Sequence, residues 1–161
     1  MLAPLEERGG RFVMEGRVLG ARDSVPMAGI TVYVYHADRK GEYGEPYPRL
    51  AGVLRTDAEG RFRVWSVLPG QYEGAPHIHF EAWGPGLPLR TWFVNLYMGP
   101  GEKADSTWGR MVRTRRRTLD ADRPETFVTR DTKGVFHARY DLRWSRAFTP
   151  LAELDSLRRG R

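Results

Sequence analysis

Residues 29–36 have the sequence GITVYVYH, which indicates the class of fold. Aliphatic residues alternate here with threonine and tyrosine, and a repeat of two is the side-chain period of a β-strand. Because both sets of side chains are bulky, both faces of this strand are expected to be covered. A strand with two covered faces is typical of a sheet packed against a second layer.

Segments of the same kind occur along most of the chain, separated by turn sequences such as Asp57-Ala58-Glu59-Gly60. Eighteen glycines and eleven prolines are consistent with many turns. The expected strands are 11–18, 29–36, 51–56, 61–67, 77–83, 90–98, 125–129 and 135–143. The sequence therefore predicts an all-β fold, an antiparallel β-sandwich of about eight strands with long loops.

The size of the chain suits one domain. With 161 residues, 40% of them hydrophobic, we expect a single domain over 1–161 with its sandwich core at about 11–145. Residues 99–124 have little apolar periodicity and are expected to form a long loop. Near the C-terminus, Thr149 can cap and Pro150 can begin a helix, and leucines recur after them on one side. These features predict a short helix at about 150–159.

Two tyrosines and a His-x-His motif are the main candidates for chemistry. Because residues 77–80 alternate polar and apolar, His77 and His79 are expected on one face of a strand, about 7 Å apart at their Cα atoms. Tyr43 and Tyr72 each follow a glycine-containing turn. Tyrosine loses its proton only near pH ~10, but a hard, highly charged ion can hold it as phenolate. The four residues together therefore suggest a ferric ion.

Other interpretations of these residues remain open. A His-x-His motif on a strand is often two partly exposed histidines, and tyrosines in loops often pack with a hydrated hydroxyl. His77 and His79 could also bind zinc or copper, although tyrosinate is an unusual ligand for either metal.

A series of short motifs in a fixed order covers about residues 12–145. They are Gly16-Arg17-Val18, Pro26 with Ala28-Gly29, Val32-Tyr33-Val34, Tyr35-His36-Ala37-Asp38, Gly41-Glu42-Tyr43, Arg55-Thr56-Asp57, Gly60-Arg61-Phe62, Pro69-Gly70-Gln71-Tyr72, Pro76-His77-Ile78-His79-Phe80, Gly134-Val135-Phe136 and Tyr140-Asp141-Leu142. In this order they resemble the intradiol ring-cleavage dioxygenases, the family of the catechol and protocatechuate dioxygenases. The Pro-Gly-x-Tyr motif followed closely by His-x-His is the specific part of this resemblance.

The resemblance implies a site and a reaction. Tyr43, Tyr72, His77 and His79 take the places of the family's Fe(III) ligands, with Tyr43 and His77 equatorial and the other two axial. An aromatic 1,2-diol would bind iron through both oxygens and displace Tyr72, which would act as ligand and as base. With O₂, the bond between the two hydroxylated carbons would break and give a muconate-type diacid.

One position departs from the family pattern. Better-known members carry an arginine three residues before the first histidine, where this chain has Gly74. Such a charge-stabilising group commonly contributes a few kcal/mol to catalysis. Arg90 is the first candidate for a replacement, and Arg49 and Arg55 are others, although surface charges would explain all three. Asn95 resembles the position of a glutamine near the substrate, or is an ordinary strand amide.

The absent arginine leaves a second hypothesis open, a weak or inactive intradiol-like sandwich that binds a metal or an aromatic compound. The two other histidines are not expected to be metal ligands. We expect His36 to pack or to support the site, and His137 to be structural or exposed.

Overall composition limits the partners of the protein. The net charge is +6, with an arginine cluster at 113–117, but no recognised nucleic-acid motif is present, so no nucleic-acid binding is expected. There are no cysteines, which excludes disulfides and thiolate ligands. We found no leader or membrane span, so a cytoplasmic protein is expected. By the resemblance, its partners would be a small aromatic diol, O₂ and further copies of itself in a homo-oligomer.

Overall fold

The structure is a computed structural model that describes residues 1–20, 24–72, 74–99 and 124–144, and all regular elements in these ranges are β-strands. They are β1 (Arg11–Gly20), β2 (Thr31–His36), β3 (Leu50–Arg55), β4 (Arg61–Val67), β5 (His77–Gly84), β6 (Leu87–Met98), β7 (Glu125–Arg130), β8 (Phe136–Arg139) and β9 (Leu142–Trp144). The all-β prediction is confirmed. Every expected strand is present within a few residues of its expected ends, and the last is divided in two at Tyr140 and Asp141.

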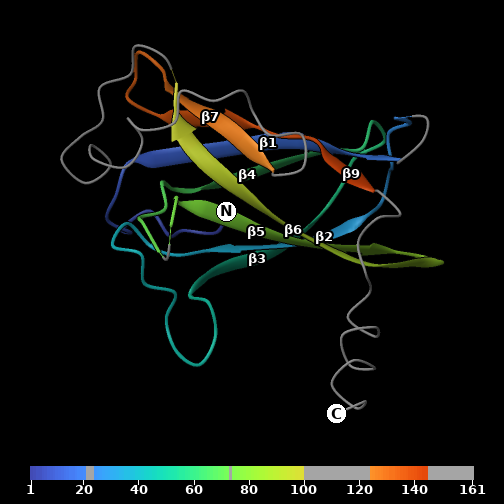
Figure 1. Cartoon of the computed structure of the whole chain (residues 1–161), viewed down its shortest axis with the longest axis horizontal. Helices are drawn as coiled ribbons and strands as arrows, with labels where there is room; N and C mark the ends of the chain where they lie inside the picture. Colours follow the sequence, from blue (N-terminus) through green and yellow to red (C-terminus); the bar gives the residue numbers. More distant parts are fainter. Residues whose placement is uncertain (21–23, 73, 100–123, 145–161) are drawn as a thin grey trace.

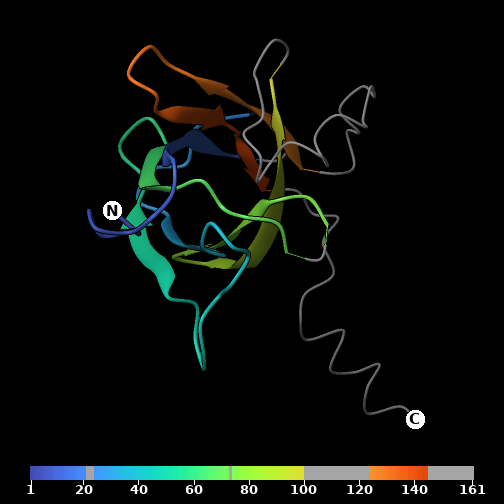
Figure 2. The same ribbon diagram turned by 90° about the vertical axis from the view of Figure 1, so that its left-hand side faces the viewer.

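The strands form one sheet with the order β3-β2-β5-β6-β7-β8-β1-β4, and β9 pairs with β1 beside this path. In Figure 1, β2, β3 and β5 lie in one layer and β1, β7 and β9 in the other. The long strand β6 pairs with β5 on one side and β7 on the other, and so connects the layers. The sheet curls until its two end strands, β3 and β4, come into contact (Figure 2).

The prediction of a purely antiparallel sandwich was wrong in one respect. Strand pairs β1–β8, β1–β9 and β6–β7 are parallel, so the sheet is mixed. The turn signals specify only strands that are neighbours in sequence, whereas a parallel pair needs a connection of a dozen or more residues. The segment between β6 and β7 provides that length.

The core lies between the two layers. Alternation places Val32 and Val34 of β2 and Ile78 and Phe80 of β5 in this core, where all four are fully buried. Facing them are buried residues of the other layer, such as Phe62, whose ring lies 5.6 Å from that of Phe80. Each polar residue between the buried positions of β5 is thereby directed to the outer face of its layer.

Two predicted elements lie outside the described residues: the C-terminal helix at 150–159 and nearly all of the loop at 99–124. Within the ranges given above, no helix could reach across a membrane.

Candidate metal centre

His77 and His79 lie side by side on the outer face of β5, as predicted. Their ring centroids are 4.8 Å apart, and both side chains are partly buried. Nδ1 of His77 lies 2.9 Å from the carbonyl oxygen of Ala75. Because a carbonyl only accepts hydrogen bonds, Nδ1 carries a proton, and in the neutral imidazole it is then Nε2 that has the lone pair. His77 therefore presents Nε2 as a ligand atom.

The hydroxyl of Tyr43 meets both imidazoles. It lies 3.1 Å from Nε2 of His77 and 3.0 Å from Nε2 of His79. Tyr43 follows the last residue of β2 by seven positions, in a loop that returns its side chain over β5. The structure thus brings together three of the four predicted ligand atoms.

The two distances from the Tyr43 oxygen to the imidazole nitrogens fit ligand atoms of one metal ion. For ligand bonds of about 2.0–2.1 Å, an angle of 90° separates two donor atoms by about 2.9 Å, and a tetrahedral angle by about 3.3 Å. The observed 3.0 and 3.1 Å are nearer to the right-angled value. Nowhere in the described ranges do three or more His, Cys, Asp or Glu side chains gather into a possible metal site. A metal centre there would therefore need tyrosine oxygen.

Tyr72 lies next to Tyr43 but is more open to solvent. Their ring centroids are 5.1 Å apart with the rings nearly perpendicular, and Tyr72 is 42% exposed. Its hydroxyl makes no hydrogen bond with any residue the structure describes. Tyr72 is thus the least constrained of the four predicted ligands.

Burial favours the neutral forms of Tyr43 and His79. It raises the pKa of Tyr43 to about 12, with smaller contributions from Tyr35 and Tyr72. Burial, together with a smaller effect of the neighbouring His77, lowers the pKa of His79 to about 4. At neutral pH His79 is therefore in the neutral form that binds metals. Tyr43 would lose its proton only to a strongly charged ion.

Strand β6 brings one of its two predicted site residues to the histidines. Asn95 pairs directly with His77 and therefore shares its face of the sheet. Arg90 pairs with the buried Ala82, on the opposite face, and is five residues or about 17 Å along β6 from Asn95. The structure does not bring Arg90 to the site, because Arg90 is five positions from Asn95. An odd spacing along a strand places two side chains on opposite faces.

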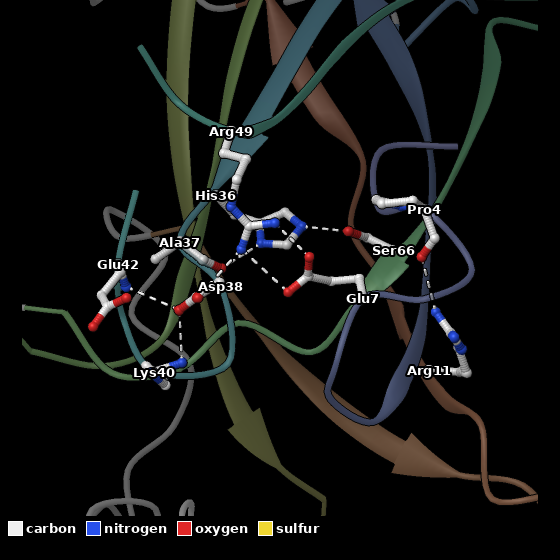
Figure 3. Close-up of polar contacts among 10 residues, drawn as sticks. All are labelled: Pro4, Glu7, Arg11, His36, Ala37, Asp38, Lys40, Glu42, Arg49 and Ser66. Atoms are coloured by element: carbon white, nitrogen blue, oxygen red, sulfur yellow. Dashed lines mark hydrogen bonds and ion pairs between the residues drawn. The ribbon is translucent and has the colours of Figure 1, made fainter. Parts of the chain in front are cut away.

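The other candidate arginines interact elsewhere. Arg55 lies at the far end of β3, where its Nη2 donates to the carbonyl oxygen of Gly29 at 3.2 Å. Arg49 lies near the site but its guanidinium forms ion pairs with Glu7 and Asp38 (Figure 3). Its backbone N–H also donates to the carbonyl oxygen of Tyr43 at 2.7 Å. Arg49 therefore supports the loop of Tyr43 without facing the ligand atoms.

Asp38 organises this loop, a role that none of the sequence motifs above predicts. Its Oδ1 accepts from the backbone N–H groups of Lys40 at 2.7 Å and Glu42 at 3.1 Å, and its Oδ2 from Arg49 at 3.3 Å (Figure 3). Its carbonyl oxygen accepts from the N–H of Gly70, at 2.7 Å. Asp38 thus connects the loop that carries Tyr43 with the loop that leads to Tyr72.

A recurring sequence pattern could have identified this turn. Asp-x-x-Gly occurs at 38–41, 57–60 and 131–134. In each case Oδ1 of the aspartate accepts from the second and fourth following N–H groups, and the glycine has a positive φ. Only the first of the three aspartates is buried.

The two tyrosine loops touch through glycines. A Cβ at Gly41 would lie 1.9 Å from the carbonyl oxygen of Gln71, and one at Gly70 would lie 2.4 Å from that of Arg39. The backbones can approach so closely only without side chains at these positions. Gly74 differs: a Cβ there would meet nothing within 4 Å, but its φ of 135° is one that other residues rarely adopt. An arginine at this position would need a different backbone conformation.

The remaining histidines behave as expected. His36 is fully buried, with Nδ1 2.7 Å from the carbonyl oxygen of Ala37 and Nε2 2.7 Å from Oγ of Ser66. This packing role agrees with the prediction. His137 is partly exposed and pairs with Asp131 at 3.0 Å.

Comparison with known proteins assigns the family. The family model described as Dioxygenase matches residues 2–86, just over half of the chain. The chain belongs to the intradiol ring-cleavage dioxygenase family. Among its relatives, catechol 1,2-dioxygenase 2 of Acinetobacter lwoffii is 33% identical over an alignment of 112 residues, and the match covers 55% of this chain and 40% of that protein. The protocatechuate 3,4-dioxygenase beta chain of Burkholderia cepacia is 33% identical over an alignment of 97 residues, and the match covers 49% of this chain and 41% of that protein. The matches thus span about two fifths of these relatives.

Solved structures of the family share the fold over most of this chain. The dioxygenase domain of a dioxygenase and carbohydrate-binding fusion from Streptomyces sp. SirexAA-E has a TM-score of 0.65 and 25% identity, covering 91% of this chain and 86% of that one. An intradiol ring-cleavage dioxygenase from Tetranychus urticae has a TM-score of 0.66 and 18% identity with the same coverage. At the lower identity the likeness concerns the fold alone.

Proposed function

We propose that this chain binds Fe(III) through Tyr43, Tyr72, His77 and His79 and cleaves an aromatic 1,2-diol with O₂. The bond between the two hydroxylated carbons would break, both oxygen atoms would enter the product, and the product would be a muconate-type diacid. The observation that carries the proposal is the meeting of the Tyr43 hydroxyl with two imidazole nitrogens at 3.0 and 3.1 Å. Family membership supports the same chemistry.

Each residue of the site has a distinct task in this proposal. His77, His79 and Tyr43 are held by β5 and by the Asp38 turn, so they suit permanent ligands. Tyr72 is exposed and has no hydrogen bond to a described residue, so it suits a ligand that moves aside. On leaving, its Oη would take one proton from the diol. Bound Fe(III) would supply the Lewis acidity that favours loss of the diol protons and the electronic coupling that makes the ring reactive toward O₂.

Two neighbours on β6 would contact the diol. The amide of Asn95, directly across from His77, would donate a hydrogen bond to a diol oxygen. The Phe93 ring lies 5.9 Å from that of His77 and 6.3 Å from that of His79, and it is 52% exposed. It would pack against the ring of the diol and exclude water from it.

A second candidate function is an inactive or weakly active member that binds the metal or an aromatic compound. The conformation of Gly74 favours it, because no arginine can occupy that position without a change in the backbone. Neither Arg90 nor Arg49 faces the ligand atoms instead. A member that binds iron without activity would differ from the first candidate in turnover alone.

The experiment loads the purified protein with ferric iron and measures metal content, visible absorbance and O₂ consumption with catechol. We expect one iron per chain, a tyrosinate-to-iron charge-transfer band that gives a red colour, and O₂ uptake. His77→Ala and His79→Ala should lose the iron, whereas His137→Ala, on the outer face of the other layer, should retain it. Full iron binding by both of the first two variants would disprove the ligand assignment.

Two other results would select a different function. A coloured protein that is inert toward all diols would support the binding module. A colourless protein that binds zinc would exclude Fe(III) as the partner of this site. Tyr72→Phe should keep its iron but lose part of the charge-transfer absorbance, since the ring contact with Tyr43 remains and one phenolate is removed.

A further inference from the structure

The outer face of the sheet continues from the candidate metal centre as a surface of aromatic rings. It includes Tyr33 and Tyr35 of β2, Trp83 of β5 and Phe93 of β6, with Glu81 of β5 between them. Register places all five on the face that carries His79. Trp83 is 39% exposed and Phe93 52%. We refer to these five residues as the aromatic platform.

The platform is continuous with the metal centre. The ring of Tyr35 lies parallel to that of His79, with centroids 4.5 Å apart and an angle of 1° between the planes. Tyr33 follows at 5.3 Å from Tyr35. On the other side of His79 is Phe93, its partner across the strands. A flat group beside His79 would therefore have an aromatic ring on each neighbouring strand, Tyr35 on β2 and Phe93 on β6, and Tyr33 of β2 further along.

Glu81 gives the platform a chemical preference. It lies between Tyr33 and Thr91 in register, two residues or about 7 Å from His79. Its partly buried carboxylate makes no hydrogen bond or ion pair with any residue that the structure describes. It raises the pKa of Tyr35, after the larger effect of burial. A carboxylate in such surroundings would accept hydrogen bonds from hydroxyl groups and would repel a second carboxylate.

We propose that the aromatic platform is a subsite for a second, hydroxylated aromatic ring on the diol. The substrate class would then be aryl-substituted catechols, and carboxylated catechols would bind less well. Trp83, four residues or about 13 Å beyond His79, forms the far end of this subsite. This inference rests on the proposed function, because it uses the diol to place the first ring.

The test compares catechol with 4-phenylcatechol on the iron-loaded protein. Calorimetric Kd values without O₂ and KM values with O₂ should both favour 4-phenylcatechol by about tenfold, the upper range for a stacked aromatic pair. In Trp83→Ala this preference should fall to about twofold. Trp65→Ala is the matched control: Trp65 is 45% exposed but lies on β4, in the other layer, and its loss should leave the preference unchanged.

A second comparison examines the carboxylate. A hydroxyl group on the phenyl ring should tighten binding about threefold or more in the wild type, because it can donate one hydrogen bond to the Glu81 carboxylate. The same hydroxyl should have no effect on binding in Glu81→Ala. Equal Kd values for all diols in the wild type would overturn the inference. So would a change of oligomeric state in Trp83→Ala with an unchanged preference, since the platform would then be a contact between copies of the chain.

Failure of the subsite and failure of the proposed function can be distinguished. If catechol is cleaved and the phenyl ring brings no gain, the platform inference is wrong and the proposed function stands. If no diol is cleaved but 4-phenylcatechol binds with a Trp83-dependent Kd, the platform inference stands and the proposed function is wrong.

Discussion

Replacing Asp38 with alanine should loosen both tyrosine loops and leave the sheet intact. The carboxylate accepts two backbone hydrogen bonds and one from Arg49, while the carbonyl oxygen of Asp38 accepts the N–H of Gly70. Hydrogen bonds to a charged group contribute about 1.5–3 kcal/mol each but are not additive within one network. For this buried carboxylate we expect a loss of about 3 kcal/mol in the free energy of unfolding.

Two other turns provide matched controls. Asp57 and Asp131 occupy the same position in turns of the same hydrogen-bond pattern, but both are exposed and neither turn contacts a tyrosine loop. Asp57→Ala and Asp131→Ala should therefore cost less stability than Asp38→Ala, because water replaces an exposed carboxylate more easily than a buried one.

Urea unfolding and iron titration together test this reasoning. Asp38→Ala should bind iron at least tenfold more weakly and show a weaker charge-transfer band, while both control variants keep wild-type values. Asp38→Asn should recover part of the iron affinity, because its amide oxygen can still accept from Lys40 and Glu42. If Asp38→Ala matched the controls in both measurements, the turn would have no role in placing Tyr43 and Tyr72.

Two further changes address the loops and the buried histidine. Gly41→Ala should destabilise the protein by more than about 2 kcal/mol and weaken iron binding, because its Cβ would lie 1.9 Å from a carbonyl oxygen. Gly86→Ala, with a similar positive φ but open space around it, should cost only about 1 kcal/mol and leave iron binding unchanged, as urea unfolding and iron titration would show. Burial lowers the pKa of His36 to about 4, below its unfolded value of 6.5, so the unfolded chain binds the extra proton first as pH falls. Stability should therefore decrease from pH 6.5 to 4, by about 3 kcal/mol from this group, and His36→Gln should reduce that slope in urea unfolding measured across the same range.

The strands were predictable because local alternation fixes them, as in residues 29–36, where buried and partly buried positions alternate as the sequence does. The parallel pairs were not, since β6 and β7 are joined by a long segment without periodicity. Placing His77 and His79 on one face required only the strand period. Their meeting with Tyr43 was not predictable, because the Asp-x-x-Gly pattern at 38–41 marks a turn but not the contacts of this loop with β5 and with Gly70.

Arg90 shows why strand register matters for a candidate site residue. It is near the histidines in sequence and was the first candidate for the missing cation. Strand register places it on the other face of the sheet, opposite Ala82. Counting residues from Asn95 would have revealed the odd spacing, but only if the pairing of Asn95 with His77 had been known. Register is a property of two strands, and one strand cannot supply it.

The place of β1 in the sheet has a consequence for biosynthesis. Of the nine described strands, β1 is made first, and it is flanked by β4 on one edge and by β8 and β9, the last two of the nine, on the other. Until residues 136–144 have emerged, a growing chain exposes one edge of β1 to other polypeptides. The sheet can therefore be completed only after β8 and β9 have been translated. Chaperones that shield strand edges would be most needed before then.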